Sequence, residues 1–95
     1  MYYRLYKVED KNGKDKTDEA SLNRIGRVFD FTVDYLLSAE NSSVYLECVY
    51  PSFLKSVITS HVVAVESNKE IVKLYTENSI YYFVEDNELM EKNNG

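Results

Sequence analysis

The residues most able to do chemistry are a single histidine, His61, and a single cysteine, Cys48, in a chain of 95 residues. A thiolate beside an imidazole can act as a nucleophile, and both side chains can bind zinc. One chain supplies too few of them for the usual four Cys/His zinc ligands. Cys48 alternates with Val44 and Leu46 on the apolar face of an expected strand, where a free cysteine is most often a small buried hydrophobic residue. A structural role for Cys48 is therefore favoured over a Cys-His pair.

Other catalytic patterns receive little support from the sequence. Ser60 directly precedes His61, whereas a catalytic serine and histidine are recognised by their geometry in space. The 16 acidic residues form no Asp-x-Asp-x-Asp-Gly loop, and most stand where expected strand ends and turns meet solvent. Phosphate-binding glycine loops and the His-Glu-x-x-His zinc motif are absent from the sequence. We therefore predict a chain that is not an enzyme and that has no catalytic residues, metal site or cofactor.

Tyrosine is the compositional exception, because the chain has nine tyrosines and no tryptophan. An apolar ring with a polar tip suits tyrosine both to barrel interiors and to protein contact surfaces. If the two terminal strands pair, a tyrosine-rich patch lies across that seam. Structural packing is the favoured alternative, and stacking of nucleic-acid bases is a third use. The candidate interaction surface is Tyr2, Tyr3, Tyr6, Tyr81 and Tyr82.

Charge is uneven along the chain, whose net charge is −5. Residues 1–27 hold seven basic and five acidic groups, and residues 28–95 hold four basic and eleven acidic groups. A net negative chain is disfavoured as a general nucleic-acid binder, because Lys and Arg contacts to phosphate supply most non-specific affinity. The early basic residues still form a candidate basic loop, which consists of Lys11, Lys14, Lys16, Arg24 and Arg27.

The stretch 62–84 holds the densest supply of core-forming residues and predicts three strands joined by two hairpin turns. β-Branched and aromatic runs are separated there by short segments that contain asparagine, a residue that tolerates turn conformations. The segment 34–43 predicts a packed turn or short helix, and 53–60 is ambiguous, with a bulge or sharp bend at Ser60-His61. The expected strands are residues 2–9, 25–33, 44–50, 62–66, 71–76 and 80–85.

These elements predict an all-β fold, a small SH3-like or OB-like partly open barrel of five to six antiparallel strands. A compact sandwich is the alternative architecture. We expect one domain at residues 1–86, followed by a polar, frayed tail at 87–95. No apolar run approaches the roughly 20 residues of a membrane span. The N-terminus lacks a signal-peptide pattern, so we expect a cytoplasmic protein without a membrane partner.

Three short segments carry a resemblance to a group of proteins. They are Thr76-Glu77-Asn78-Ser79-Ile80-Tyr81, with the pattern Thr-x-Asn-Ser-x-Tyr, together with Leu54-Lys55-Ser56 and Arg24-Ile25-Gly26-Arg27. This set resembles small uncharacterised all-β proteins of low-GC bacteria and their phages or other mobile elements. The resemblance implies an accessory gene product and assigns no activity to any residue.

Three functional hypotheses follow from the sequence. The first is a non-catalytic protein-interaction module with a protein partner, which would be an accessory or regulatory protein of a mobile element or phage. The second is an acidic nucleic-acid mimic that inhibits a nucleic-acid-binding protein, motivated by the acidic residues 28–95. The third is a weak single-strand nucleic-acid binder that uses the basic loop and the tyrosines.

Overall fold

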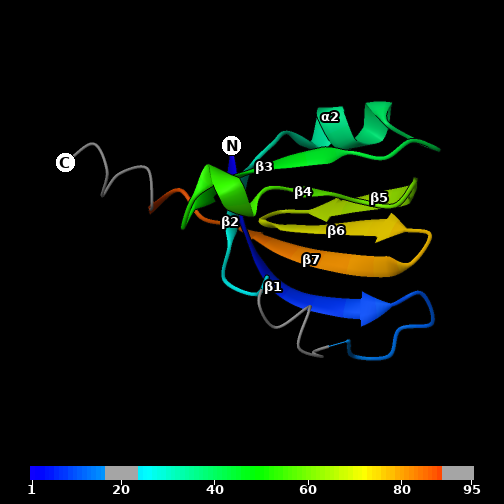
Figure 1. Ribbon diagram of the computed structural model, residues 1–95. Coiled ribbons are helices and arrows are strands. Elements are labelled where there is room, and N and C mark those ends of the chain that lie inside the picture. The colour runs from blue at the N-terminus through cyan, green and yellow to red at the C-terminus, as the bar shows by residue number, and fades with distance from the viewer. Residues whose placement is uncertain (17–23, 89–95) are drawn as a thin grey trace.

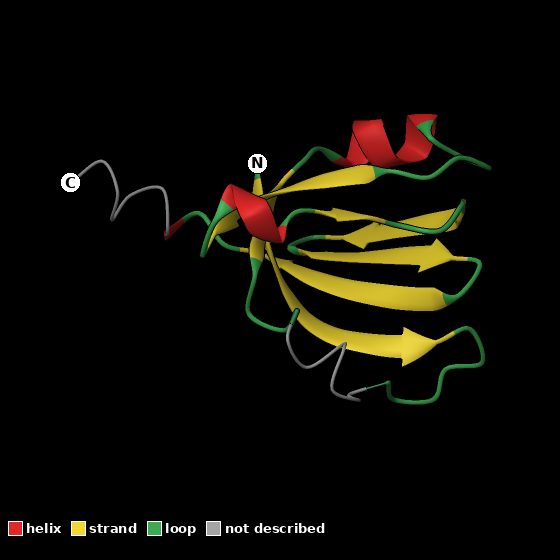
Figure 2. Cartoon of the chain, in the orientation of Figure 1, coloured by secondary structure: helices red, strands yellow, loops and turns green. Residues whose placement is uncertain are grey.

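Seven antiparallel strands form one sheet in the computed structural model, which describes residues 1–16 and 24–88 (Figures 1 and 2). The order across the sheet is β4-β3-β2-β1-β7-β6-β5. The predicted all-β class is therefore confirmed. The strands are β1 (Tyr2–Asp10), β2 (Val28–Asp30), β3 (Tyr45–Tyr50), β4 (Val57–Ile58), β5 (Val62–Asn68), β6 (Ile71–Thr76) and β7 (Ser79–Glu85), with an α-helix, α2 (Val33–Ser38), and a 3-10 helix, η1 (Phe53–Lys55).

Two strands depart from the expected set by more than two residues or were not expected at all. The seventh strand is β4, a two-residue strand inside the ambiguous segment 53–60. The expected strand 25–33 is reduced to the three residues of β2. Gly26 has a φ of +92°, a turn conformation, so residues 25–27 cannot belong to a regular strand and β2 begins only at Val28. After β2, Thr32 caps α2 by accepting a hydrogen bond from the Tyr35 backbone N–H, which confirms the predicted short helix.

The two hairpins of β5, β6 and β7 form as the sequence predicts, but the residues that make their turns differ from the expected asparagines. Lys69, and not the neighbouring Asn68, takes the left-handed conformation between β5 and β6, with a φ of +54°. Thr76 holds the turn between β6 and β7, because its Oγ1 accepts from the Ser79 N–H at 3.1 Å and donates to the Ser79 carbonyl at 2.9 Å. These contacts fix the register of two strands that both contribute to the core, β6 with Val72 and Leu74 and β7 with Ile80, Tyr81 and Phe83.

The core lies on the concave side of the curved sheet. Phe29 and Phe31 are 1% and 5% exposed, which confirms that this face of the predicted second strand points inward. Phe83 from β7 meets both rings, at centroid distances of 6.0 Å and 5.0 Å. Leu36 from α2 is fully buried and belongs to the same cluster. The helix therefore supplies part of the layer that a short sheet needs for stability in water.

The sheet curves until its two edges approach each other, but it is not closed. β4 and β5 stand at opposite edges of the sheet and are joined by residues 59–61 alone. Such a connection spans at most about 14 Å. The Val62 N–H donates to the Ser42 carbonyl at 2.9 Å, and the Thr59 N–H donates to the Val44 carbonyl at 3.0 Å. The chain before β3 thus contacts both edges, and the predicted bend at Ser60-His61 carries the chain from one edge to the other.

Two expectations extend beyond the described part of the chain. Residues 89–95 of the predicted tail lie outside the described residues, as do residues 17–23, which separate the first and second groups of the candidate basic loop. The domain boundary at residue 86 therefore stays a prediction. Within the described ranges, no helix has the length and apolar character that a bilayer crossing requires.

Candidate protein-interaction surfaces

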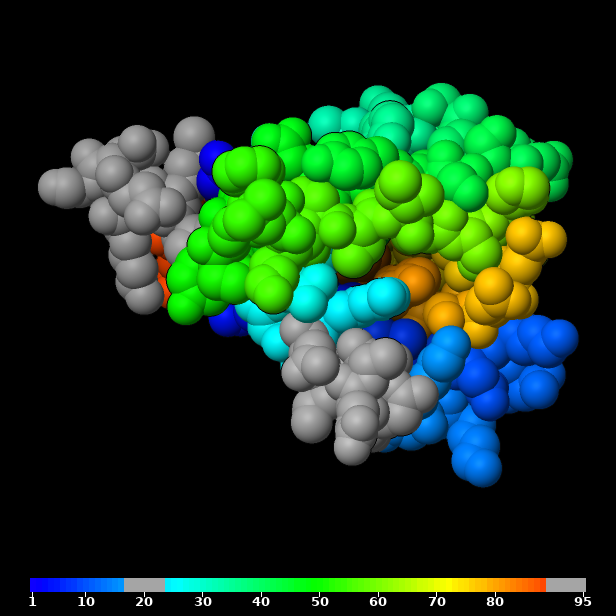
Figure 3. Space-filling view, in the orientation of Figure 1, coloured from blue at the N-terminus to red at the C-terminus, as the bar shows by residue number. Residues whose placement is uncertain are grey.

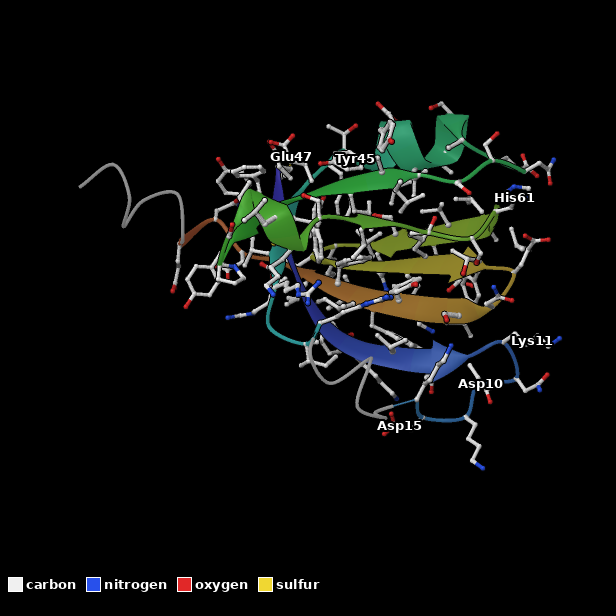
Figure 4. The ribbon with its side chains drawn as sticks, viewed as in Figure 1. Asp10, Lys11, Asp15, Tyr45, Glu47 and His61 are labelled. Carbon is white, nitrogen blue, oxygen red and sulfur yellow. The ribbon has the colours of Figure 1, made fainter. Side chains whose placement is uncertain are left out.

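The two residues with the clearest chemical potential lie in different settings. Cys48 is fully buried, as predicted, and its thiol donates a hydrogen bond to the Tyr50 carbonyl at 3.0 Å. His61 is exposed just before β5, where its Nδ1 lies 3.5 Å from the Glu77 carboxylate (Figure 4). Among the described residues, no three His, Cys, Asp or Glu side chains gather as a metal site.

The two terminal strands are neighbours, as the sequence suggests, because β1 pairs with β7 from Tyr3↔Glu85 to Asp10↔Ser79. Strand alternation nevertheless divides the five candidate tyrosines. Tyr3 and Tyr81 are 6% and 7% exposed and belong to the core. Tyr2 is half-buried, Tyr6 is exposed and Tyr82 is half-buried, so the seam presents fewer tyrosines than predicted.

A β-bulge places Tyr6 on the outer face of this seam. Leu5 pairs with Phe83 and Lys7 pairs with Tyr82, so Tyr6 is the extra residue on β1. The rings of Tyr6 and Tyr82 lie 6.1 Å apart. Consecutive residues of a regular strand point to opposite faces. The bulge is therefore the reason that Tyr6 and its neighbour Lys7 both lie on the outer face.

The outer-face Tyr82 is engaged by its own chain. Its hydroxyl donates to the Glu9 carboxylate, and the Lys7 ammonium lies 3.3 Å from the other oxygen of Glu9. The Lys7 and Lys73 ammonium groups lie 5.2 Å and 5.0 Å from the centroid of the Tyr82 ring. Both the hydroxyl and the ring therefore have intramolecular partners, as expected for cation–π contacts at a surface.

These contacts shift two pKa values. The hydrogen bond from Tyr82 is the largest cause that lowers the pKa of Glu9 below its ordinary value. The same hydrogen bond is the largest cause that raises the pKa of Tyr82 to about 12. Each shift favours the pair in which Glu9 is ionised and Tyr82 is neutral, because only that pair keeps the charge-assisted hydrogen bond.

We expect Glu9→Gln to lower the pKa of Tyr82 from about 12 toward its ordinary value of 10. The phenolate absorbance of the folded chain, titrated with base, measures this change, and subtraction of the Tyr82→Phe titration isolates the signal of Tyr82. The pKa of Glu9 is lower in the folded chain than in the unfolded chain. Ionised Glu9 therefore stabilises the fold fully at pH values above its unfolded pKa, and this stabilisation is lost as the pH falls through its folded pKa. E9Q should therefore also reduce the loss of stability in acid. An unchanged alkaline titration in E9Q would contradict the assigned hydrogen bond.

The first part of the candidate basic loop surrounds the turn that follows β1 (Figure 4). The Asp10 carboxylate accepts from the backbone N–H groups of Asn12 at 2.8 Å and Lys14 at 3.0 Å, which holds the predicted Asn-Gly turn. Lys11 and Lys14 are exposed on this turn. Lys16 leads back along β1, and its ammonium donates to the Ser79 hydroxyl at 3.0 Å.

The arginines of the candidate basic loop lie elsewhere along β1. The Leu5 N–H donates to the Arg27 carbonyl at 2.9 Å, which places Arg24 and Arg27 about five residues, or about 17 Å, from the β1 turn. The Arg27 guanidinium donates to the Lys55 carbonyl at 3.0 Å, so it points toward η1. The five basic residues are thus spread along β1, with Lys16 between the turn and the arginines because its backbone N–H donates to the Val8 carbonyl at 2.9 Å.

A different surface carries exposed apolar side chains that the sequence analysis did not single out. It covers β3, η1 and β4, which lie on the face of the molecule shown in Figure 3. Phe53, Leu54 and Ile58 are 70%, 78% and 74% exposed, and Tyr45 stands directly opposite Ile58 in the ladder of β3 and β4. We name this surface the apolar ridge and define it as Tyr45, Tyr50, Phe53, Leu54 and Ile58.

Hydrogen bonds from two serine hydroxyls hold the backbone of η1 in place. The Ser52 hydroxyl accepts from the Leu54 N–H at 3.2 Å and caps the first turn. The Ser56 hydroxyl accepts from the Cys48 N–H at 2.9 Å and donates to the Phe53 carbonyl at 2.6 Å. These bonds connect η1 to β3. Phe53 and Leu54 are therefore presented on an ordered backbone, which reduces the entropy lost on binding.

Residue types alone do not reveal this surface. Large apolar residues in a weakly alternating segment are as compatible with a buried edge strand as with an exposed turn, since exposure depends on the packed neighbours. A usable signal is Ser52 before Phe53-Leu54, which is an N-cap pattern after Pro51 and indicates a short helical turn.

Comparison of the chain with protein-family models, curated proteins and solved structures finds no match.

Proposed function

We propose that this chain is a non-catalytic protein-interaction module that binds a protein partner through the apolar ridge. The observation that carries the proposal is the exposure of Phe53, Leu54 and Ile58, each at 70% or more, on the ordered β3-η1-β4 segment. Apolar surface gains about 25 cal/mol per Å² when it leaves water, so these side chains favour a partner that covers them. Exposed apolar patches mark interaction sites in many proteins.

The apolar ridge is a better candidate than the tyrosine seam. On the seam, Tyr82 already contacts Glu9, Lys7 and Lys73. A partner that used the ring of Tyr82 would first have to displace these contacts. Phe53 and Leu54 have apolar side chains whose exposed surface requires no such exchange, so their burial favours binding directly.

The two nucleic-acid hypotheses receive less support. Two of the acidic side chains in residues 28–95, which would form a mimic, are engaged within the chain: Asp86 with Arg4, and Glu66 with the Tyr75 hydroxyl. Two of the five basic residues proposed to bind single strands are engaged within the chain, because Lys16 donates to the Ser79 hydroxyl and Arg27 donates to the Lys55 carbonyl.

We further propose that the curved sheet is a partly open barrel of the SH3-like or OB-like kind. The short connection between β4 and β5, at opposite sheet edges, supports this reading. We also propose that the protein is an accessory or regulatory protein of a mobile element or phage. The Thr-x-Asn-Ser-x-Tyr resemblance of residues 76–81 and the exposed binding surface support that role.

We expect the double substitution Phe53→Ala and Leu54→Ala to weaken partner binding by at least about tenfold, because interface anchors commonly contribute more than 1 kcal/mol each. Both side chains are largely exposed, so the thermal unfolding temperature should change little. The measurement is quantitative capture from extract of the natural host, with and without nuclease, followed by titration of the purified partner.

Tyr6→Ala is the matched control, because Tyr6 is a large exposed side chain, at 43%, on the outer face of β1. It should leave capture unchanged. Equal capture by the double variant and the unmodified chain would reject the apolar ridge. Capture that vanishes with nuclease treatment would instead favour a nucleic-acid partner.

A further inference from the structure

β5 is an edge strand whose outer side is open over most of its length. Val62 makes outer-side hydrogen bonds with Ser42 and Asn41. Across the described ranges, residues 63–67 show no backbone hydrogen bond to a segment other than β6. The other edge strand, β4, has two residues and offers little to pair with, whereas β5 has seven. Short edges are a common protection against unwanted pairing, and β5 lacks this protection.

The first half of β5 is apolar, and the protective features of this strand are Glu66 and a β-bulge between Val62 and Ala64. Its first four residues, 62–65, are Val-Val-Ala-Val, and the strand contains neither lysine nor proline. Val63 is 56% exposed. An exposed apolar edge stretch without lysine or proline can pair with another extended chain.

An apolar groove lies beside this open edge, between α2 and β5. It encloses about 180 Å³ and is lined by Leu36, Leu37 and Glu40 together with residues 62–65. Leu37 is 54% exposed and forms the helix side of the groove. Glu40 is the one charged residue that lines it, and Glu66 follows directly on β5. The groove therefore combines aliphatic walls with negative charge.

We propose that this groove binds an extended segment of a partner protein as an added strand on β5. An unpaired strand edge presents alternating N–H and C=O groups, and an extended backbone is the ligand that matches them. Alternate side chains of that segment would point into the groove, where aliphatic groups fit against Leu37 and Val63. A Lys or Arg beside them would pair with Glu40.

A second copy of this chain is a poorer occupant than a basic segment. Each copy carries a net charge of −5, so pairing of two β5 edges would bring two negatively charged chains together, each with a Glu66 on the paired strand. Like charges across paired strands are destabilising. The groove shares no residue with the apolar ridge, so the two proposals succeed or fail separately.

The test uses the full chain and a phage-displayed library of random peptides of about nine residues, long enough to pair with the open edge. We expect selection of peptides in which aliphatic residues alternate with other residues and a Lys or Arg is present. Amide hydrogen exchange should slow at alternate residues of 63–67 when a selected peptide is bound, because the N–H groups that do not pair with β6 become part of a new ladder. Failure to select any peptide, or protection confined to another segment, would overturn the proposal.

Two substitutions sharpen this test without touching the core. Leu37→Glu and Glu40→Lys should each weaken the selected peptide by about tenfold or more, and replacing the peptide's Lys or Arg by Glu should restore affinity for E40K alone. Leu54→Glu, on the apolar ridge, should retain peptide affinity. Unchanged binding to L37E would overturn the groove assignment. Concentration-dependent dimers with residues 63–67 already protected would identify a second copy as the occupant and overturn the proposed partner.

Discussion

Replacing Phe83 by alanine is expected to lower the free energy of unfolding by about 3–5 kcal/mol, the usual cost of removing a buried phenylalanine ring. Phe83 is fully buried on β7, where Leu5 of β1 and Val72 of β6 are its cross-strand neighbours. Its ring also meets the rings of Phe29 and Phe31. Three strands and the aromatic cluster therefore lose contacts together.

This loss is large for a chain of 95 residues. At about 0.05–0.15 kcal/mol per residue, the total stability is of the order of 5–14 kcal/mol. Urea unfolding followed by circular dichroism measures the change. Val84→Ala is the matched control, because the next residue of β7 is only half-buried and should lose far less. A loss below about 1 kcal/mol in the Phe83 variant would show that the core is centred elsewhere.

Thr59→Val is expected to lower the free energy of unfolding by about 1–3 kcal/mol, the cost of leaving a buried polar group without its partner. Thr59 is 4% exposed. Its Oγ1 accepts from the Val44 N–H at 3.2 Å and donates to the Ser60 carbonyl at 2.7 Å. Valine has a similar shape but no hydroxyl, so it removes both bonds at the place where the sheet edges approach each other.

Thr59→Ser is the matched control for this second substitution. Serine keeps the hydroxyl and loses a methyl group, so it should remain closer to the unmodified chain than valine does. Amide hydrogen exchange at Val44 provides a local measurement, and it should accelerate in T59V before global unfolding. If T59V is as stable as T59S, the hydroxyl does not hold the two edges together.

The two proposed binding surfaces rely on different physics. The apolar ridge presents preformed side chains, so its binding depends on the burial of Phe53 and Leu54. The groove beside β5 presents backbone groups, so its binding depends on an extended ligand and on the charge of Glu40. A substitution on one of these surfaces should therefore leave binding at the other surface unchanged.

Several features of the fold follow from local sequence patterns. Strand alternation and β-branched residues predict β5, β6 and β7, and the Asn-Gly pair predicts the turn after β1. The same alternation predicts that Cys48 is buried and that Phe29 and Phe31 point inward. These predictions succeed because each rests on residues that are close in sequence and share one strand.

The candidate sites depend on contacts between segments that are far apart in sequence. Alternation alone leaves open which face of β1 and β7 is buried, so it could not separate the core residues Tyr3 and Tyr81 from the outer Tyr82. The exposure of Phe53 and Leu54 likewise depends on what packs around η1, and the open side of β5 depends on its place in the strand order.

The amino-acid sequence by itself determined the all-β class, the hairpins at residues 62–85 and the absence of familiar catalytic motifs. The tertiary structure alone decided which apolar residues remain in contact with water and which strand edge remains unpaired. The physical reason is that the period of a strand sets which side chains share a face, whereas burial of that face and pairing of that edge are set by distant segments.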